Sequence, residues 1–220
     1  MTVHVEDARD PATGIRRAGQ VCLWVALLGA ASGVYLAVVD PAVDEDQWSY
    51  PQTVEAFTVT QVWFSVQHLG LVLGLLALWW SGAVGPRRLG RFGHYGAVAG
   101  MLGLTVTELA AISAANDSMD TARVGVLGAT YGIVSILLGA ALVAEGVAVA
   151  RAGVWHGWRR WVPFAMGVWV FVPMLPALAL SFTAARFAIS GWMLLFAALG
   201  WALSNAEGRR RQATLQTEQV

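Results

Sequence analysis

Three ionisable side chains lie inside long apolar stretches of this sequence and are the first candidates for chemistry. His68, Glu108 and Arg186 combine an imidazole, a carboxylate and a guanidinium. Ionisable groups are unfavourable in hydrocarbon, so within membrane segments they usually face the protein interior and often mark a path for protons or ions. A histidine and a carboxylate together would suit a proton-linked process.

Uncharged polar residues accompany these groups at helical spacing. Intervals of three and four residues place the polar positions before His68 on one face of a helix. Each polar neighbour lies one or two helical turns from an ionisable residue; the neighbours are Gln61, Ser65, Thr105 and Ser190. We therefore expect a polar pocket in which Glu108 and Arg186 approach each other and His68 completes the lining.

Two structural alternatives to this pocket stay open at the level of sequence. Glu108 and Arg186 could form a buried ion pair that only fixes the register of the helices. Arg186 could instead extend its guanidinium towards the lipid headgroups. A connection at residues 40-56 is longer than helix connections usually are, and Trp48 and Tyr50 within it are expected to dock on the rim as a cap over the pocket.

Cofactor chemistry finds little support in the residue types. A bis-histidine haem needs two histidines from facing helices, and His68 alone is expected at depth. The other three histidines, His4, His94 and His156, are expected in or beside cytoplasmic segments. The same shortage of ligands argues against zinc. The single cysteine, Cys22, can form no disulfide within the chain. No cofactor and no metal are predicted.

One short stretch resembles a known family. Gln67-His68-Leu69-Gly70, followed by Gly74, resembles the histidine helix of rhomboid intramembrane proteases, and Ser190-Gly191 resembles part of their serine motif. In that family the serine precedes the histidine along the chain, whereas here the order is reversed, and Ala188 replaces the first glycine of the serine motif. We therefore assign no catalytic role from this resemblance.

The elements that must position these residues are membrane-spanning helices. Hydrophobic residues make up 57% of the chain and charged residues 13%, against about 45–50% and about 25% in soluble domains. A helix needs roughly 20 mostly apolar residues to cross a bilayer. Six stretches meet this requirement and predict an all-α bundle: Ala18–Val39, Phe57–Trp80, Gly93–Ala114, Val124–Ala150, Trp161–Ser181 and Ala185–Leu203.

The distribution of charge predicts the orientation of this bundle. Twelve of the fourteen basic residues, all of them arginines, fall before the first span or after the second, fourth and sixth spans. The positive-inside rule then places both termini in the cytoplasm. The absence of lysine among the basic residues suggests a GC-rich bacterial genome. The opposite connections carry Arg123 and Arg186 with a group of acidic residues: Asp40, Asp44, Glu45, Asp46, Glu55, Asp117 and Asp120.

Small residues and prolines indicate how the spans pack. Glycines spaced four residues apart let helix backbones approach closely, and all four such pairs are expected inside the bundle: Gly29 with Gly33, Gly70 with Gly74, Gly96 with Gly100, and Gly128 with Gly132. Pro173 and Pro176 predict a bend in the fifth span. No convincing repeat of three helices plus three is found, which weakly disfavours a common transporter architecture.

These observations predict a multi-pass protein of the plasma membrane whose specific function the sequence leaves open. Residues 1-17 form a cytoplasmic segment, 18-204 the transmembrane domain, and 205-220 a polar tail expected to be disordered. The first hypothesis is transport or sensing of a small molecule or ion through the outer polar pocket. The alternatives are a non-catalytic scaffold or accessory subunit and an intramembrane enzyme. The expected partner is the lipid bilayer, nucleic acid is not expected, and the oligomeric state is undetermined.

Overall fold

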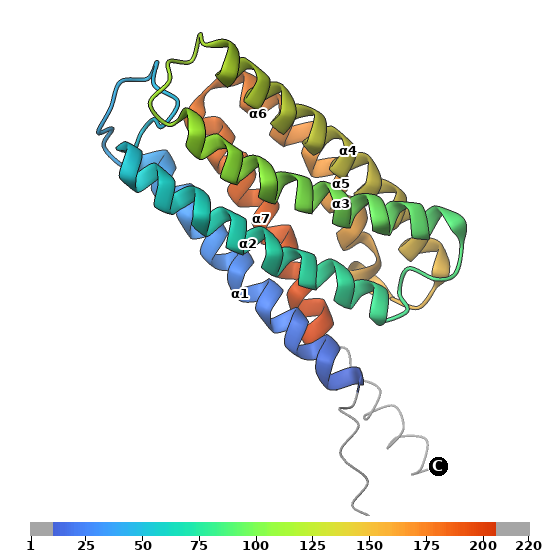
Figure 1. Ribbon diagram of the computed structural model, residues 1–220. Helices are drawn as coiled ribbons and strands as arrows, with labels where there is room; N and C mark the ends of the chain where they lie inside the picture. Colours follow the sequence, from blue (N-terminus) through green and yellow to red (C-terminus); the bar gives the residue numbers. More distant parts are fainter. Residues whose placement is uncertain (1–10, 206–220) are drawn as a thin grey trace, which may run out of the picture.

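The computed structural model of the chain describes residues 11–205 and consists of long helices (Figure 1). Six of its helical segments are long and apolar enough to cross a membrane, so the predicted all-α, six-span fold class is confirmed and the chain is a multi-pass membrane protein. The segment 1–10 and the predicted tail after Asn205 lie outside the described residues. The α-helices are α1 (Pro11–Val38), α2 (Val54–Trp80), α3 (Arg88–Ala111), α4 (Ala122–Ala152), α5 (Val162–Trp169), α6 (Leu175–Leu180) and α7 (Phe182–Ser204).

Four of the six spans are single α-helices, the third ends in the 3-10 turn Ile112–Ala114, and the fifth is interrupted within its length. Helices α5 and α6 belong to one span, Gly157–Leu180, which begins with the 3-10 turn Gly157–Trp161. Between α5 and α6 the backbone forms a π-helical turn, Val170–Met174, that contains Pro173. Proline cannot donate the backbone hydrogen bond of a regular helix, which accounts for the break at this position.

The spans form a ring in which each packs against its neighbours in chain order. Helix α1 closes the ring by packing along α7, and this contact and that between α3 and α4 are the most extensive. The first and last described residues lie at the same end of the bundle (Figure 1), which we call the terminal end. The opposite end carries residues 39–53, 112–121 and Ser181, and we call it the loop end.

Short polar side chains start all three helices that begin at the loop end. Thr53 accepts a hydrogen bond from the backbone of α2, Thr121 from that of α4 and Ser181 from that of α7. These N-caps satisfy backbone N–H groups that the first turn of a helix leaves without partners. The starts of α2, α4 and α7 are therefore fixed at the end of the bundle where the polar residues gather.

Glycine contacts confirm close helix packing for three of the four predicted pairs. A Cβ atom on any of these six glycines would meet atoms of a neighbouring helix: Gly29, Gly33, Gly70, Gly74, Gly96 and Gly100. The prediction was wrong for the fourth pair, because a Cβ on Gly128 or Gly132 would have no neighbouring atom within 4 Å. These two glycines lie on the loop-end half of α4, where the broken fifth span no longer covers them.

Cys22 lies in a close contact between α1 and α2. Its side chain is 0% exposed, and its thiol sulfur lies 3.5 Å from the carbonyl oxygen of Phe196 on α7. Gly74 on α2 provides the room for the sulfur, since a Cβ there would overlap it. The chain's single cysteine is therefore enclosed by three helices.

The two connections at the loop end are joined to each other. The backbone N–H of Trp48 donates to the carbonyl of Asp117 at 3.0 Å, and that of Met119 donates to the carbonyl of Asp46 at 2.7 Å. Gln47 and Ser118 form an isolated antiparallel β-bridge between these bonds. The connection between α1 and α2 is thus tied to the connection between α3 and α4.

Candidate functional site

Antiparallel packing of α2 against α3 brings most of the predicted polar residues to one interface. The hydroxyl of Ser65 lies 2.9 Å from the carbonyl of Gln61 in its own helix and 3.3 Å from that of Thr105 on α3. The Thr105 hydroxyl donates to the carbonyl of Met101 at 3.0 Å. Ser65 and Thr105 therefore satisfy their hydroxyl groups locally, as buried polar groups must in a bilayer.

Glu108 is the centre of a hydrogen-bond network near the loop end. Its Oε2 atom accepts a bond of 2.7 Å from the amide nitrogen of Gln61 and one of 2.7 Å from the phenol of Tyr131. The same amide nitrogen lies 3.3 Å from the Tyr131 hydroxyl oxygen. This network links α2, α3 and α4 through one carboxylate oxygen. Tyr131 was not predicted as a member.

Arg186 lies across this network on α7 and forms no direct ion pair with Glu108. Its guanidinium carbon lies 4.8 Å from the ring centre of Phe182 and 5.9 Å from that of Phe64. Within residues 11–205, no hydrogen bond to the guanidinium is found, so its five N–H donors point to no protein acceptor. We call Gln61, Glu108, Tyr131 and Arg186 the loop-end cluster.

Aromatic residues from the connection between α1 and α2 cover this cluster. The ring of Trp48 lies 6.5 Å from that of Tyr131, and the ring of Tyr50 lies 5.2 Å from that of Phe182 in an edge-to-face arrangement. Trp48 also packs against two small groups of buried residues at the ends of α2, α3 and α4. Both predicted cap residues thus contact side chains that touch Glu108 or Arg186.

His68 and Ser190 lie farther from Glu108. His68 is on the same face of α2 as Gln61, two turns deeper; it is 6% exposed, and its Nδ1 atom has no hydrogen-bond partner in the part of the chain that the structure describes. The Ser190 hydroxyl donates to the carbonyl of Arg186 at 2.8 Å and packs against Gly33 of α1. Ser190 is therefore bonded to its own helix and not to His68, unlike the serine–histidine pair of an intramembrane protease.

A second buried polar pair lies nearer the terminal end and was missed from the sequence. His94 Nδ1 lies 2.9 Å from Glu145 Oε1, and the two side chains are 2% and 0% exposed. The indole of Trp79 stacks on the imidazole with 4.8 Å between ring centres. Nothing in the sequence predicts this burial, because His94 lies one turn after Arg91, at the terminal end of α3. Glu145 Oε2 is buried and has no hydrogen-bond partner among residues 11–205.

Metal ligation has no candidate in the described chain. No group of three or more His, Cys, Asp or Glu side chains gathers anywhere in residues 11–205. What the loop-end cluster offers instead is one guanidinium for an anionic group and one carboxylate already held by two neutral donors.

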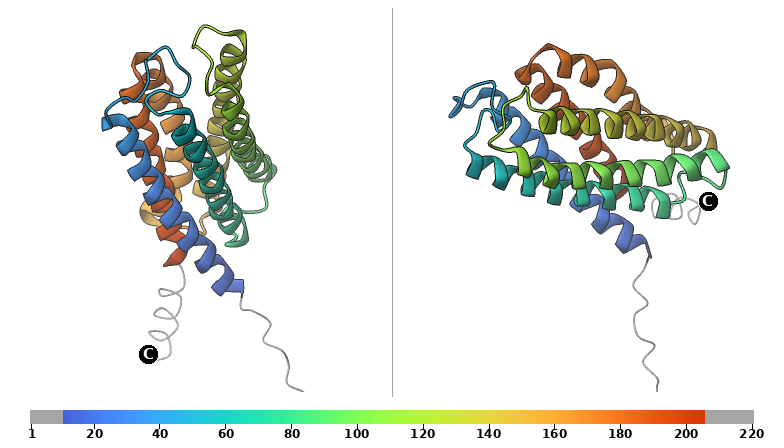
Figure 2. Two further views of the ribbon diagram at one scale, coloured as in Figure 1. Left: turned by 60° about the vertical axis from the view of Figure 1, so that its left-hand side comes forward. Right: turned by 45° about the horizontal axis from the view of Figure 1, so that its top comes forward.

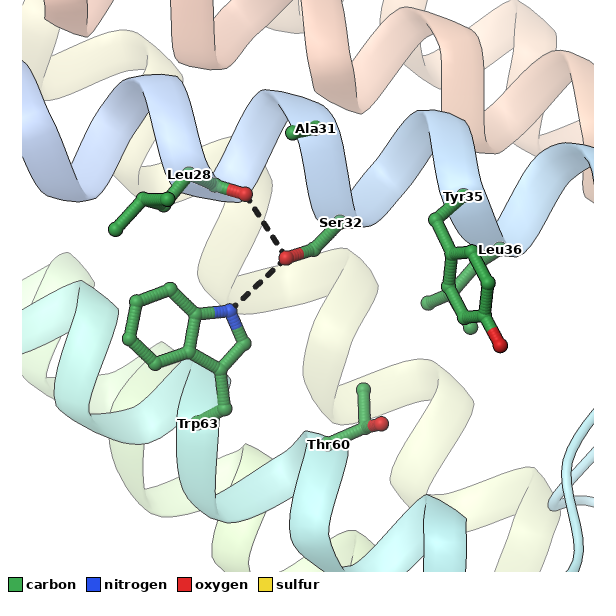
Figure 3. A pocket seen from close by; sticks show the side chains of 7 residues that line it. All are labelled: Leu28, Ala31, Ser32, Tyr35, Leu36, Thr60 and Trp63. Atoms are coloured by element: carbon green, nitrogen blue, oxygen red, sulfur yellow. Dashed lines mark hydrogen bonds between the residues drawn. The ribbon is translucent and has the colours of Figure 1, made fainter.

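Two shallow hollows lie on the outside of α1, away from the loop-end cluster. One, of about 340 Å³, lies between α1 and α2 (Figure 3), where the Trp63 indole donates to the Ser32 hydroxyl at 3.1 Å. The hydroxyl donates in turn to the carbonyl of Leu28 at 2.8 Å. The other, of about 640 Å³, is bordered by Arg17 and Trp24. Both open on the bundle surface and have mostly apolar walls, which suits lipid chains.

Comparison with known proteins gives no match: no family model, no curated protein sequence and no solved structure is similar to this chain.

Proposed function

We propose that this chain is a bacterial plasma-membrane protein that binds a small molecule carrying an anionic group at the loop-end cluster, for transport or sensing. The observation that carries the proposal is the Arg186 guanidinium, which lies among apolar rings with no hydrogen-bond acceptor from the described protein. A guanidinium binds carboxylate and phosphate groups through two parallel hydrogen bonds, and an unpaired one is unfavourable away from water.

The surroundings of Arg186 support a ligand with a single negative charge. Glu108 on the far side of the cluster would repel a second negative charge, which favours a ligand with one anionic group and a neutral or cationic remainder. The carboxylate oxygen that Gln61 and Tyr131 hold at 2.7 Å is a fixed partner for such a remainder. The cap formed by Trp48 and Tyr50 would keep bulk water from the bound molecule, which strengthens electrostatic contacts.

Charge distribution supports the orientation in this proposal. The connections at the loop end carry most of the acidic residues, whereas the arginines of the described chain concentrate at the terminal end. Under the positive-inside rule the loop end faces outward and the termini face the cytoplasm. The loop-end cluster would then sample molecules that arrive from outside the cell.

The test measures binding of inorganic phosphate to the purified full chain in lipid nanodiscs. A bound ligand stabilises the folded state by about 2.7 kcal/mol at a hundred times its Kd, so phosphate should raise the midpoint of thermal unfolding. Arg186→Gln should abolish this rise. Arg123→Gln is the matched control, because Arg123 lies at the same end but pairs with Asp117 on the surface, where it is 60% exposed. An equal response of the Arg186 variant would contradict the proposal.

A scaffold role is the second candidate, favoured by the way in which Glu108 joins three helices. Glu108→Gln keeps an acceptor oxygen for Gln61 and Tyr131 while removing the charge. If the protein only uses the network to hold α2, α3 and α4 together, this variant should keep most of its stability, because the acceptor remains, and the wild type should show no phosphate response. If the site handles a ligand, the variant should fold normally and change its binding.

A further inference from the structure

One side of α4 is covered by the fifth span at the terminal end and uncovered at the loop end. At 3.6 residues per turn, one side of α4 carries a row of glycines: Gly125, Gly128, Gly132, Gly139 and Gly146. A Cβ on Gly139 would lie 3.0 Å from Val170, and one on Gly146 would overlap Phe164. A Cβ on any of the other three would have no neighbouring atom within 4 Å. Packing on this side therefore ends halfway along α4.

The break in the fifth span explains why the packing ends there. Beyond the π-helical turn Val170–Met174, α6 packs mainly against α7. Figure 2 shows α6 leaning towards α7 and away from α4 at the loop end. Leu180 at the end of α6 is 79% exposed, which fits a helix end that faces lipid. A Cβ at Gly128 or Gly132 would thus meet no atom of α6 within 4 Å in this half of the bundle.

The uncovered half of α4 also carries Tyr131, a member of the loop-end cluster. Tyr131 neighbours Gly132 in the chain, and the phenol of Tyr131 reaches Glu108 at 2.7 Å. At the loop end, Trp48 and Tyr50 cover the cluster. Two backbone hydrogen bonds join the connection that carries them to the connection between α3 and α4. An approach from the loop end would pass these contacts, whereas a Cβ at Gly128 or Gly132 on the side of α4 would meet no neighbouring atom within 4 Å.

We propose that the ligand of the loop-end cluster is an anionic amphiphile, a phospholipid of the outer leaflet, that reaches Arg186 sideways between α4 and α6. This inference rests on the proposed function and adds the class of ligand and its route. The phosphate would bind the Arg186 guanidinium, and the acyl chains would stay in the bilayer along the glycine row of α4. The unpartnered Nδ1 of His68, deeper on α2, offers a further polar contact below the headgroup.

The route can be blocked with little disturbance of the fold. Gly128→Leu and Gly132→Leu, together, place side chains in the open space, and leucine favours helix more than glycine does. Ile133→Phe is the matched control, because it adds bulk at the same depth on a different side of α4, where Ile133 is 61% exposed. Thermal unfolding checks that all variants fold, and the single glycine variants provide intermediate degrees of blocking.

Two probes separate a lipid from a soluble ligand in nanodiscs of zwitterionic lipid: spin-labelled phosphatidylglycerol and water-soluble glycerol 3-phosphate. We expect the wild type and Ile133→Phe to retain the labelled lipid, and the double glycine variant to bind it about tenfold more weakly. Unchanged lipid binding by the double glycine variant would overturn the lateral route. Binding of glycerol phosphate through Arg186 without binding of the lipid would overturn this inference and leave the proposed function standing. If neither probe depends on Arg186, the proposed function itself fails.

Discussion

Tyr131 donates its phenolic hydrogen to the same oxygen of Glu108 that Gln61 contacts, so removal of the hydroxyl tests how the carboxylate is held. Tyr131→Phe deletes only the hydroxyl and keeps the ring on which Trp48 packs. Hydrogen bonds to charged groups contribute about 1.5–3 kcal/mol in proteins generally, but bonds between membrane helices average about 0.6 and reach about 1.7 kcal/mol. The short 2.7 Å bond to a carboxylate places this one at the upper end, about 1.5 kcal/mol.

The second donor makes the prediction sharper. Gln61→Leu should destabilise the protein by a similar amount, because it removes the other bond to Oε2. The double variant leaves that oxygen without a donor, so its loss of stability should exceed the sum of the single losses by about 1 kcal/mol. The free energy of unfolding would be measured by reversible denaturation in mixed micelles.

Thr130→Val serves as the control, because the Thr130 hydroxyl bonds only to the Val126 carbonyl of its own helix. It should change the stability by less than about 0.5 kcal/mol. A Tyr131→Phe protein within about 0.3 kcal/mol of the wild type, or strictly additive losses in the double variant, would refute the description of Glu108 as a carboxylate held by two donors.

Three further predictions concern packing and the second polar pair. Gly93→Leu should prevent folding, since a Cβ there would lie 2.5 Å from the Glu145 backbone nitrogen. Gly125→Leu should fold normally, because a Cβ at Gly125 meets no atom within 4 Å. Size-exclusion chromatography should show a single symmetric peak for Gly125→Leu and aggregation for Gly93→Leu. Glu145→Ala should lower the free energy of unfolding by about 3–5 kcal/mol, because it leaves buried His94 without its partner. Replacing both residues with leucine should restore most of this stability. Equal losses for the single and the double variant in denaturation experiments would contradict an interacting pair. Trp48→Ala should destabilise the protein by about 2 kcal/mol, and proteolysis of the connection between α1 and α2 should accelerate; an unchanged cleavage rate would show that Trp48 does not hold the connection.

The spans were predictable because the bilayer leaves the backbone few choices. Each predicted stretch must pair its own N–H and C=O groups, so apolar length alone identifies the helices. The ends were less predictable, since hydropathy does not set them. α3 begins at Arg88 and not at Gly93, a shift of just over one turn.

Membership of the candidate site was only partly predictable. Helical spacing brought Gln61 and Glu108 into the prediction, and the structure places them in contact. Tyr131 was overlooked although it is the one aromatic residue in the predicted fourth span, and Glu145 although it is the one charged residue there. A single aromatic residue and a single charged residue in an apolar span are signals that the sequence alone displays. The separation of α6 from α4 was not, because a proline predicts a bend without giving its direction.

The enclosed position of Cys22 gives this chain a practical advantage for chemical mapping. A thiol that is 0% exposed should react slowly with maleimides, so the natural protein already has a low labelling background. Single cysteines introduced at Asp44 and at Arg87 could then report directly which aqueous compartment each connection faces in intact cells. A membrane-impermeant reagent should modify the first and spare the second, and the opposite pattern would invert the assigned orientation.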